Sequence, residues 1–289
     1  MVILAAALGI GAAAFIFFGK APKENVHLLS SVSSFGITNL DEVVSAMRQA
    51  LKSRADIGID LNLKGEYMDD ISPMVKELME LAFEYTGRSD EGDYIRYQVG
   101  GYEFSYGHEK RGDGYIYSIV IKPNYYDSKE QEQETDEKIR EILSSGEISA
   151  AASDYEKIRA VYDYIALNVK YDAVHKKNDH YGLKNTAFGA LVNKTAVCQG
   201  YAVAMYRLLL ELGIENHIIT GVGITASSGE EHAWNLVLLD GKYYYIDPTW
   251  NYTVREEDYF LKGSEDFKDH VPDQGFEEMY GVSDYSYYR

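Results

Sequence analysis

A two-residue turn, Asp240-Gly241, separates two stretches of alternating residues and constrains the fold more than any other feature of the sequence. Asp-Gly favours the type I′ turn, whose twist matches the twist of the strands that it joins. The turn predicts an antiparallel hairpin in which Leu239 faces Lys242. The register of the whole hairpin follows from this turn, since one extra turn residue would move every side chain to the other face.

His232 and Asp247 lie on the same face of this predicted hairpin. In that register Asp247 faces Trp234, and His232 faces Thr249 on the neighbouring strand. Diagonal neighbours are ~7–8 Å apart at the backbone, which brings an imidazole and a carboxylate within hydrogen-bonding reach. The sequence therefore predicts a histidine whose tautomer and orientation are fixed by an aspartate.

Cys198 is the only cysteine in the 289 residues, and the surrounding pattern places it at the beginning of a helix. Apolar residues at helical spacing run from Val203 to Leu210, and Gly213 ends the helix. The free backbone N–H groups and the positive dipole end at a helix start stabilise a thiolate, and they can stabilise an oxyanion. Gly200 leaves room for a close approach of the backbone.

These residues together form a Cys-His-Asp arrangement. His232 would take the thiol proton of Cys198 and later donate a proton to a leaving group, while Asp247 orients the imidazole. A buried apolar thiol, a core histidine and an aspartate at a strand end are the structural alternatives. A metal site from Glu230, His232 and Asp247 is another alternative, although one cysteine excludes a zinc site with two thiolates. We predict no metal and no cofactor.

Three segments resemble the motifs of the transglutaminase-like superfamily, and the similarity extends over about residues 154–269. The segments are Val197-Cys-Gln-Gly-Tyr-Ala202, His232-Ala-Trp-Asn235 and Asp247-Pro-Thr-Trp250. The resemblance implies an α+β, papain-like core in which the cysteine helix packs against an antiparallel sheet. It also implies Cys198 as nucleophile, His232 as general base and acid, and Asp247 as the orienting group. The whole chain is similar to bacterial cell-surface proteins with a small α/β unit before this core.

The sequence also departs from parts of this family. Animal transglutaminases carry a tryptophan upstream of the cysteine, whereas both tryptophans of this chain lie downstream. The chain has no room for their calcium-binding and β-barrel domains, and it lacks the cysteines for the zinc site of the peptide-glycanase branch. The residues predicted to line or support the cleft are Gln199, Gly200, Tyr201, Trp234 and Trp250. Core packing is the alternative for Tyr201 and for both tryptophans.

Residues 1–19 are predicted to be a membrane anchor or a signal segment, and residues 20–36 a linker. The first eighteen residues are apolar and would span about 27 Å as a helix, close to the hydrocarbon thickness of a bilayer. A cleaved signal peptide and a buried helix are the alternatives, and the usual basic stretch before the segment is missing. An anchor or a signal would place the rest of the chain outside the cytoplasm.

Residues 37–126 are predicted to form a small α/β domain. Within it, the pattern predicts a helix over 40–54 after a Thr38 or Asn39 cap, and a strand over 56–67. A helix capped by Ser72 and strands over 93–106 and 114–122 follow.

Residues 127–153 are predicted to be a connecting helix that leads into a transglutaminase-like domain over 154–289. Ser153 is predicted to cap the first helix of that domain. Residues 173–186 are predicted to be a loop that carries His175 and His180, with surface histidines as the default interpretation.

Acidic residues outnumber basic residues by 46 to 28, which gives a formal net charge of −18. Nucleic acid and anionic lipid both need a basic surface, so neither is predicted as the main partner. The expected partners are a protein or cell-wall peptide as substrate, and the membrane through the N-terminal segment. Asn193-x-Thr195 and Asn251-x-Thr253 match glycosylation acceptors, a pattern that is common by chance.

The function predicted from these features is an extracytoplasmic, membrane-anchored thiol enzyme. It would act on peptide, isopeptide or side-chain amide bonds through a thioester on Cys198. Hydrolysis is favoured because one small domain offers no evident means of excluding water. The alternatives are a protein cross-linking acyltransferase and a non-catalytic binding or assembly module that keeps the fold.

Overall fold

The computed structural model describes residues 35–225, 228–253, 259–273 and 276–288. The predicted anchor and most of the predicted linker lie outside these residues. Among the described residues, no helix is both long enough and apolar enough to cross a membrane. The described chain forms two compact units: one contains 35–84 and 99–125, and the other contains 85–98 and the residues from 126 onward. The predicted domain limits at 37–126, 127–153 and 154–289 stay predictions.

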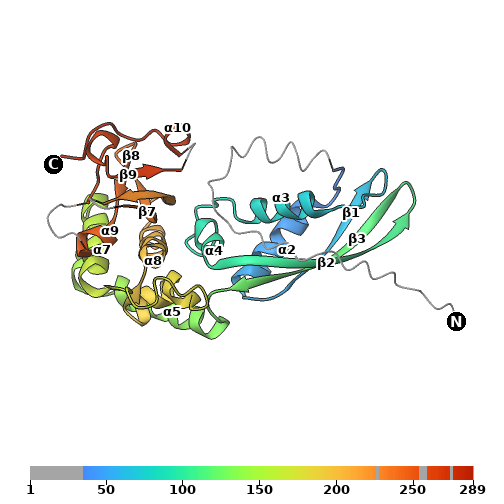
Figure 1. Ribbon diagram of the computed structural model, residues 1–289, viewed down its shortest axis with the longest axis horizontal. Helices are drawn as coiled ribbons and strands as arrows, with labels where there is room; N and C mark the ends of the chain where they lie inside the picture. Colours follow the sequence, from blue (N-terminus) through green and yellow to red (C-terminus); the bar gives the residue numbers. More distant parts are fainter. Residues whose placement is uncertain (1–34, 226–227, 254–258, 274–275, 289) are drawn as a thin grey trace. The chain divides into compact units, whose positions relative to one another are not determined.

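The first unit is a three-stranded antiparallel sheet with two helices (Figure 1). Its strands β1 (Ile57–Lys64), β2 (Val99–Arg111) and β3 (Gly114–Tyr125) lie in the order β1-β3-β2. Helix α2 (Leu40–Lys52) packs against β1 and against α3 (Ser72–Ala82). Every second residue of β1 is buried, so the predicted alternation of this strand is confirmed.

Two helix starts in the first unit differ from their predicted caps. Asn39 precedes α2, but its side-chain amide donates to the Asp60 carbonyl of β1 at 2.9 Å rather than capping the helix. Ser72 is the first residue of α3, and its backbone N–H donates to the carboxylate of Asp70 at 2.9 Å. The side chains of Asn39 and Asp70 therefore fix the connections before these two helices.

The second unit combines helices with a four-stranded antiparallel sheet in the order β8-β7-β6-β9. Its sheet strands are β6 (Asn216–Ile224), β7 (Gly229–Leu239), β8 (Lys242–Ile246) and β9 (His270–Pro272). Its α-helices are α4 (Asp93–Arg96), α5 (Lys129–Leu143), α6 (Gly146–Ala150), α7 (Asp154–Asn168), α8 (Cys198–Glu211), α9 (Pro248–Thr253) and α10 (Phe276–Met279). Two short parallel strands, β4 (Lys170–Tyr171) and β5 (Thr195–Ala196), and three short helical turns, η1 (Gly182–Asn185), η2 (Phe188–Val192) and η3 (Ser264–Asp266), complete it.

The strand predicted over 93–106 is wrong in its first part. The chain forms the short helix α4 after Gly92, whose φ is +63°, and the strand begins only at Val99. The carboxylate of Asp93 accepts the backbone N–H of Ile218 in β6 at 2.9 Å. A contact with a residue more than a hundred positions away therefore fixes this turn, and a local pattern of apolar residues does not encode it.

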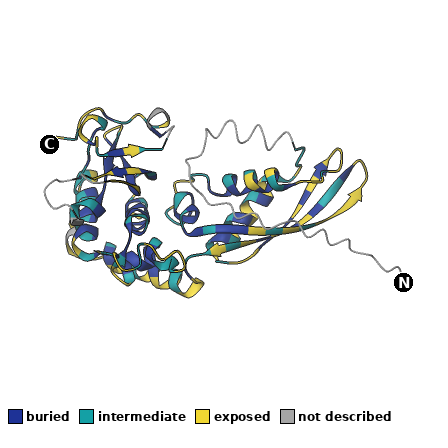
Figure 2. Cartoon of the chain, in the orientation of Figure 1, coloured by how far each residue is buried: buried dark blue, intermediate teal, exposed yellow. Residues whose placement is uncertain are grey.

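Helix α8 forms the centre of the second unit. Every residue from Gly200 to Leu209 is buried, and Figure 2 shows most of this helix in dark blue. It packs against β6, β7 and α7, and α7 begins with the predicted Ser153 cap. The predicted fold class, α+β with the cysteine helix against an antiparallel sheet after a small α/β unit, is confirmed for the described residues.

The predicted hairpin is also present. Asp240 and Gly241 both have positive φ values, 50° and 78°, as a type I′ turn requires. Leu239 pairs with Lys242, and the pairing continues in the predicted register as far as Asn235 and Ile246. The predicted pairs of Trp234 with Asp247 and of His232 with Thr249 are wrong, because the chain leaves the sheet after Ile246 and Thr249 lies in α9.

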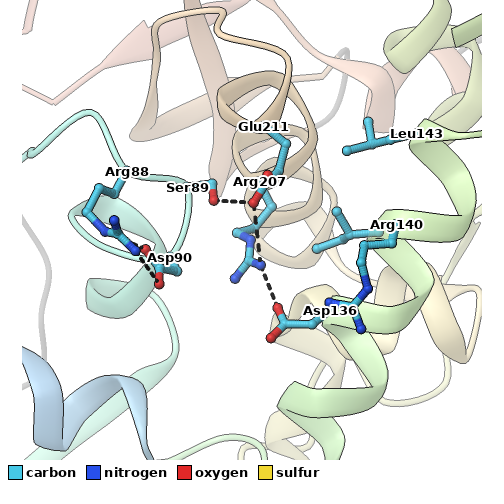
Figure 3. Close-up of a pocket in the computed structure, with 9 residues that line it drawn as sticks. Arg88, Ser89, Asp90, Asp136, Arg140, Leu143, Arg207 and Glu211 are labelled. Carbon is cyan, nitrogen blue, oxygen red and sulfur yellow. Dashed lines mark hydrogen bonds and ion pairs between the residues drawn. The ribbon is translucent and has the colours of Figure 1, made fainter. Parts of the chain in front are cut away.

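A charged pocket of about 450 Å³ lies beside the C-terminal half of α8 (Figure 3). The guanidinium of Arg207, whose side chain is only 4% exposed, contacts Glu132 and Asp136 of α5 at 3.1 and 2.6 Å. It also lies over the ring of Tyr94, 4.5 Å from the ring centroid. These contacts join α4, α5 and α8, so the buried cation of this pocket serves the packing of the second unit.

We expect Arg207→Ala to lower the free energy of unfolding by about 3 kcal/mol, because the carboxylates of α5 lose their buried cation. Urea unfolding followed by circular dichroism measures the loss. Arg111→Ala is the matched control, since Arg111 is 72% exposed and pairs with Glu109, which is 65% exposed. Its expected cost is below about 1 kcal/mol, and equal losses in the two variants would contradict the role of Arg207.

Candidate active site

The three residues predicted as a triad meet at the N-terminal end of α8. Cys198 is the first residue of α8, His232 lies in β7, and Asp247 follows β8 directly. His232 Nε2 lies 2.7 Å from Asp247 Oδ2. The Cys198 thiol forms a hydrogen bond with the imidazole of His232, and its sulfur also accepts the backbone N–H of Ala233. The structure thus brings together the residues that the hairpin register and the helix start had predicted.

The protonation states of these groups depend on one another. Burial alone would raise the pKa of the Cys198 thiol, but the hydrogen bond and positive charge of His232 outweigh burial and lower it. Burial alone would lower the pKa of His232, but Asp247 and Cys198 outweigh burial and raise it well above its usual value. These directions favour a thiolate next to an imidazolium.

Asp247 is completely buried and remains ionised because donors surround it. Against the effect of burial, His232 and then His270 hold the pKa of this carboxyl well below its usual value. Its Oδ1 accepts the backbone N–H of Thr249 at 2.8 Å, while its Oδ2 faces His232. Nε2 of His270 in β9 lies 3.2 Å from the same Oδ2.

Sequence reasoning missed His270. It lies in a strand of only three residues, which carries no readable periodicity, and it reaches Asp247 because β9 pairs with β6. The neighbouring sequence Lys268-Asp269-His270 contains an acidic residue beside a histidine, but that pair alone does not indicate a site.

A pocket of about 300 Å³ opens beside His232. Tyr171 and Trp250 provide aromatic walls, and Glu230 and Glu231 provide carboxylates. Lys176 lines the same pocket and forms an ion pair with Glu230. Cys198 as a whole residue is partly exposed, and the pocket reaches its proposed base, His232.

Tyr171 lies close enough to Cys198 for their charges to interact. Burial, and after it the negative charge of Cys198, raise the pKa of the Tyr171 phenol, so its hydroxyl stays a proton donor. Its strand β4 pairs in parallel with β5, which ends two residues before Cys198. The sequence motifs did not indicate a role for Tyr171 in the site.

The five residues predicted to line or support the cleft have different surroundings. Trp250 lines the pocket beside His232, whereas Trp234 is completely buried behind it. Gln199 donates its amide N–H to the Tyr97 carbonyl at 2.7 Å. The buried hydroxyl of Tyr201 donates to the Val169 carbonyl at 2.7 Å. Gln199, Tyr201 and Trp234 therefore support the site from within the fold.

Gly200 makes the close approach that the sequence suggested. A Cβ at this position would lie 2.7 Å from the Cβ of Ala196 and 2.8 Å from the Lys184 carbonyl oxygen. Such distances are below normal contact, so only glycine lets the start of α8 pack against the preceding segment.

The predicted loop over 173–186 contains η1 and is held by one buried amine. Nζ of Lys184, a residue only 5% exposed, donates to the carbonyls of His175, Lys176 and Asn178 at 3.0, 2.9 and 2.8 Å. This fixes the backbone of Lys176 in the pocket wall. His175 Nδ1 lies 2.8 Å from Asp172, and His180 is exposed.

The metal alternative can be compared with the arrangement of the donor atoms. Nitrogen and oxygen atoms of His232, Asp247 and His270 lie within 4.8 Å of one another, and all three residues are buried. Glu230, which the sequence had suggested as the third ligand, instead pairs with Lys176. The 2.7 Å separation of His232 and Asp247 is that of a direct hydrogen bond. The expected absence of a metal stays a prediction.

Comparison with known proteins supports the resemblance that the motifs indicated. Residues 141–248 match the family model of the Transglutaminase-like superfamily, so this part of the chain is a transglutaminase-like region. Kyphoscoliosis peptidase from Homo sapiens is 29% identical over 117 residues, and the Mus musculus protein matches equally. That match covers 37% of this chain and 17% of the relative, so the chain spans about a sixth of these relatives' length.

Among solved structures, the crystal structure of a TGase is similar to this chain. It has 21% sequence identity and a TM-score of 0.39, and the alignment covers 71% of this chain and 55% of that chain. The similarity to bacterial cell-surface proteins, by contrast, stays a prediction.

We expect iodoacetamide to alkylate wild-type Cys198 well below the free-thiol pKa of about 8.5. The chain has one cysteine, so the reaction reports this thiol alone. Because His232 lowers the pKa of Cys198, His232→Ala should move the rate profile upward in pH, toward that of a free thiol. His180→Ala, at an exposed position, is the control and should leave the profile unchanged. An unshifted profile in His232→Ala would show that no ion pair exists.

We expect Gly200→Ala to destabilise the protein by about 1–3 kcal/mol, the usual cost of forcing extra atoms into a packed region. Thermal unfolding measures the change. Gly281→Ala is the control because a Cβ there meets nothing within 4 Å. If the Gly200 variant were as stable as this control, the close packing of the α8 start would not be required.

Proposed function

We propose that this chain is an extracytoplasmic thiol enzyme that acts on amide bonds through a thioester on Cys198. Peptide, isopeptide and side-chain amide bonds are the substrates considered, and hydrolysis is the favoured outcome. The observation that carries this proposal is the continuous contact from the Cys198 thiol through His232 to the buried carboxylate of Asp247.

The geometry supports a two-step reaction. The Cys198 thiolate attacks the carbonyl carbon of the amide and forms a C–S bond, and His232 then donates its proton to the nitrogen as the C–N bond breaks. The amine leaves and a thioester remains. In the second step His232 takes a proton from water, the hydroxide oxygen bonds to the carbonyl carbon, and the C–S bond breaks. Asp247 holds the imidazole in the required tautomer throughout.

Two groups near the sulfur are suited to stabilise the oxyanion. The backbone N–H of Cys198 lies in the first turn of α8, where helix N–H groups have no partner within the helix. The phenol of Tyr171 stays protonated near Cys198. Tyr171 thus offers a donor in a chain that lacks the upstream tryptophan of animal transglutaminases.

A transfer reaction is the second candidate, and the pocket beside His232 supports it. An amine that enters this pocket would meet the carboxylate of Glu231 and could lose a proton to His232. We favour hydrolysis because the pocket leads to His232, the group that would activate a water molecule.

The location and the partners follow from the sequence rather than from the described residues. The apolar segment at 1–19 is the basis for proposing an anchor in the cell membrane, or secretion after its cleavage. A cell-surface protein or a cell-wall peptide is the proposed substrate. The net charge of −18 makes nucleic acid an unsuitable partner.

We expect the full chain to cleave members of a quenched-fluorescence peptide library, and Cys198→Ala to lose at least about a thousandfold in rate, since the nucleophile is removed. Mass spectrometry of wild-type protein quenched in acid should reveal the acyl group on Cys198. His180→Ala is the matched control and should retain full turnover.

The other outcomes separate the rival functions. A fluorescent primary amine that is incorporated into an added protein faster than hydrolysis occurs would favour the acyltransferase. Absence of turnover and of any acyl adduct, with peptide binding equal in wild type and Cys198→Ala, would favour a non-catalytic binding module.

A further inference from the structure

The contacts of the proposed active site continue beyond Asp247. His270 Nε2 lies 3.2 Å from Asp247 Oδ2, and His270 Nδ1 lies 2.8 Å from Asp269 Oδ1. The hydroxyl of Tyr259 donates to the other oxygen of Asp269 at 2.8 Å. His270 and Asp247 have side chains with no exposed surface, whereas the Asp269 side chain is 32% exposed. A row of polar groups therefore connects the buried carboxylate with the surface.

The position of His270 between two carboxylates restricts its protonation. A neutral imidazole has one N–H and can donate from only one nitrogen. With one proton, His270 would direct a nitrogen lone pair at a carboxylate oxygen of Asp247 or of Asp269. The lone pair and the negatively charged oxygen would repel each other. With a proton on each nitrogen, both contacts become charge-assisted hydrogen bonds.

The remaining neighbours of His270 are aromatic rings that fix its orientation. His232 is the one other basic group among the described residues that face the ring. Phe267 stacks on it at 3.9 Å between ring centroids, and Trp250 and Trp234 lie at 4.4 and 5.0 Å. The strand partner is Gly223 of β6, which has no side chain. The titratable groups that face the ring are Asp247, Asp269, His232 at 5.3 Å and Tyr259 at 5.6 Å between ring centroids.

We propose that His270 is a positioning residue that donates from both ring nitrogens, to Asp247 and to Asp269, and acts on Cys198 and His232 through Asp247. It holds the same carboxylate oxygen that His232 contacts. Its positive charge makes the thiolate easier to form and makes His232 readier to release a proton to the leaving group. This inference rests on the proposed thiol chemistry of Cys198, and it assigns to His270 a role that the triad alone does not contain.

Asp269→Asn tests the charge on His270 without changing any group of the triad. An asparagine amide at this position can donate to His270 Nδ1, so a neutral ring with its proton on Nε2 would be fully hydrogen-bonded. His270→Gln tests the same charge directly, because its amide N–H can still donate to Asp247.

We expect both variants to shift the pH profile of Cys198 alkylation by iodoacetamide upward, because a positive charge beside Asp247 is lost. At pH 6 the rate should fall about threefold or more. Asp273→Asn is the matched control, since Asp273 lies on the same segment but accepts from the Thr220 hydroxyl at 2.8 Å. A merely structural His270 would lower the stability of His270→Gln and leave the profile midpoint in place, with Asp269→Asn silent.

Imidazole ¹⁵N NMR of the wild-type chain gives a readout that does not depend on catalysis. We expect both nitrogens of His270, assigned by comparison with His270→Gln, to have the shifts of a doubly protonated ring at pH 7. A singly protonated ring, or an unmoved alkylation midpoint in both variants, would overturn the inference. A wild-type midpoint near the free-thiol value of about 8.5 would instead overturn the proposed function, while the NMR result would still report on His270.

Discussion

The site depends on keeping one ionised carboxylate, that of Asp247, in a place with no exposed surface. A buried charge is tolerated only when donors surround it. Its donors are His232 of β7, His270 of β9 and the backbone of Thr249, so they come from three separate segments. The registers of β6, β7, β8 and β9 must all be correct for these groups to meet. The position of His232 relative to Cys198 then follows from the packing of α8 against β7.

The parts of the site that the sequence predicted are those with strong local signals. The Asp240-Gly241 turn determines the register of β7 and β8, and the apolar spacing after Cys198 indicates a helix start. The short helix α4 and the histidine of β9 were missed for the opposite reason. Asp93 is held by Ile218, and His270 is held by strand pairing with β6, so neither arrangement can be read from neighbouring residues.

The match to the transglutaminase-like superfamily ends at residue 248, immediately after Asp247. His270, which contacts this carboxylate, lies beyond that limit, as do Asp269 and Tyr259, which continue the row of polar groups from His270. The motif tryptophans connect the two parts, because Trp234 and Trp250 both contact His232 and His270. Both rings therefore pack around the pair of histidines, and Trp250 also lines the pocket.

The amine of Lys184 occupies, among three backbone carbonyls, the place that a bound inorganic cation takes in many loops. A cation that is part of the chain does not dissociate, so chelators and changes in external calcium leave this turn unaffected. The same turn carries Lys176 into the pocket beside His232. The shape of that part of the pocket is therefore set during folding and needs no inorganic ion from the medium.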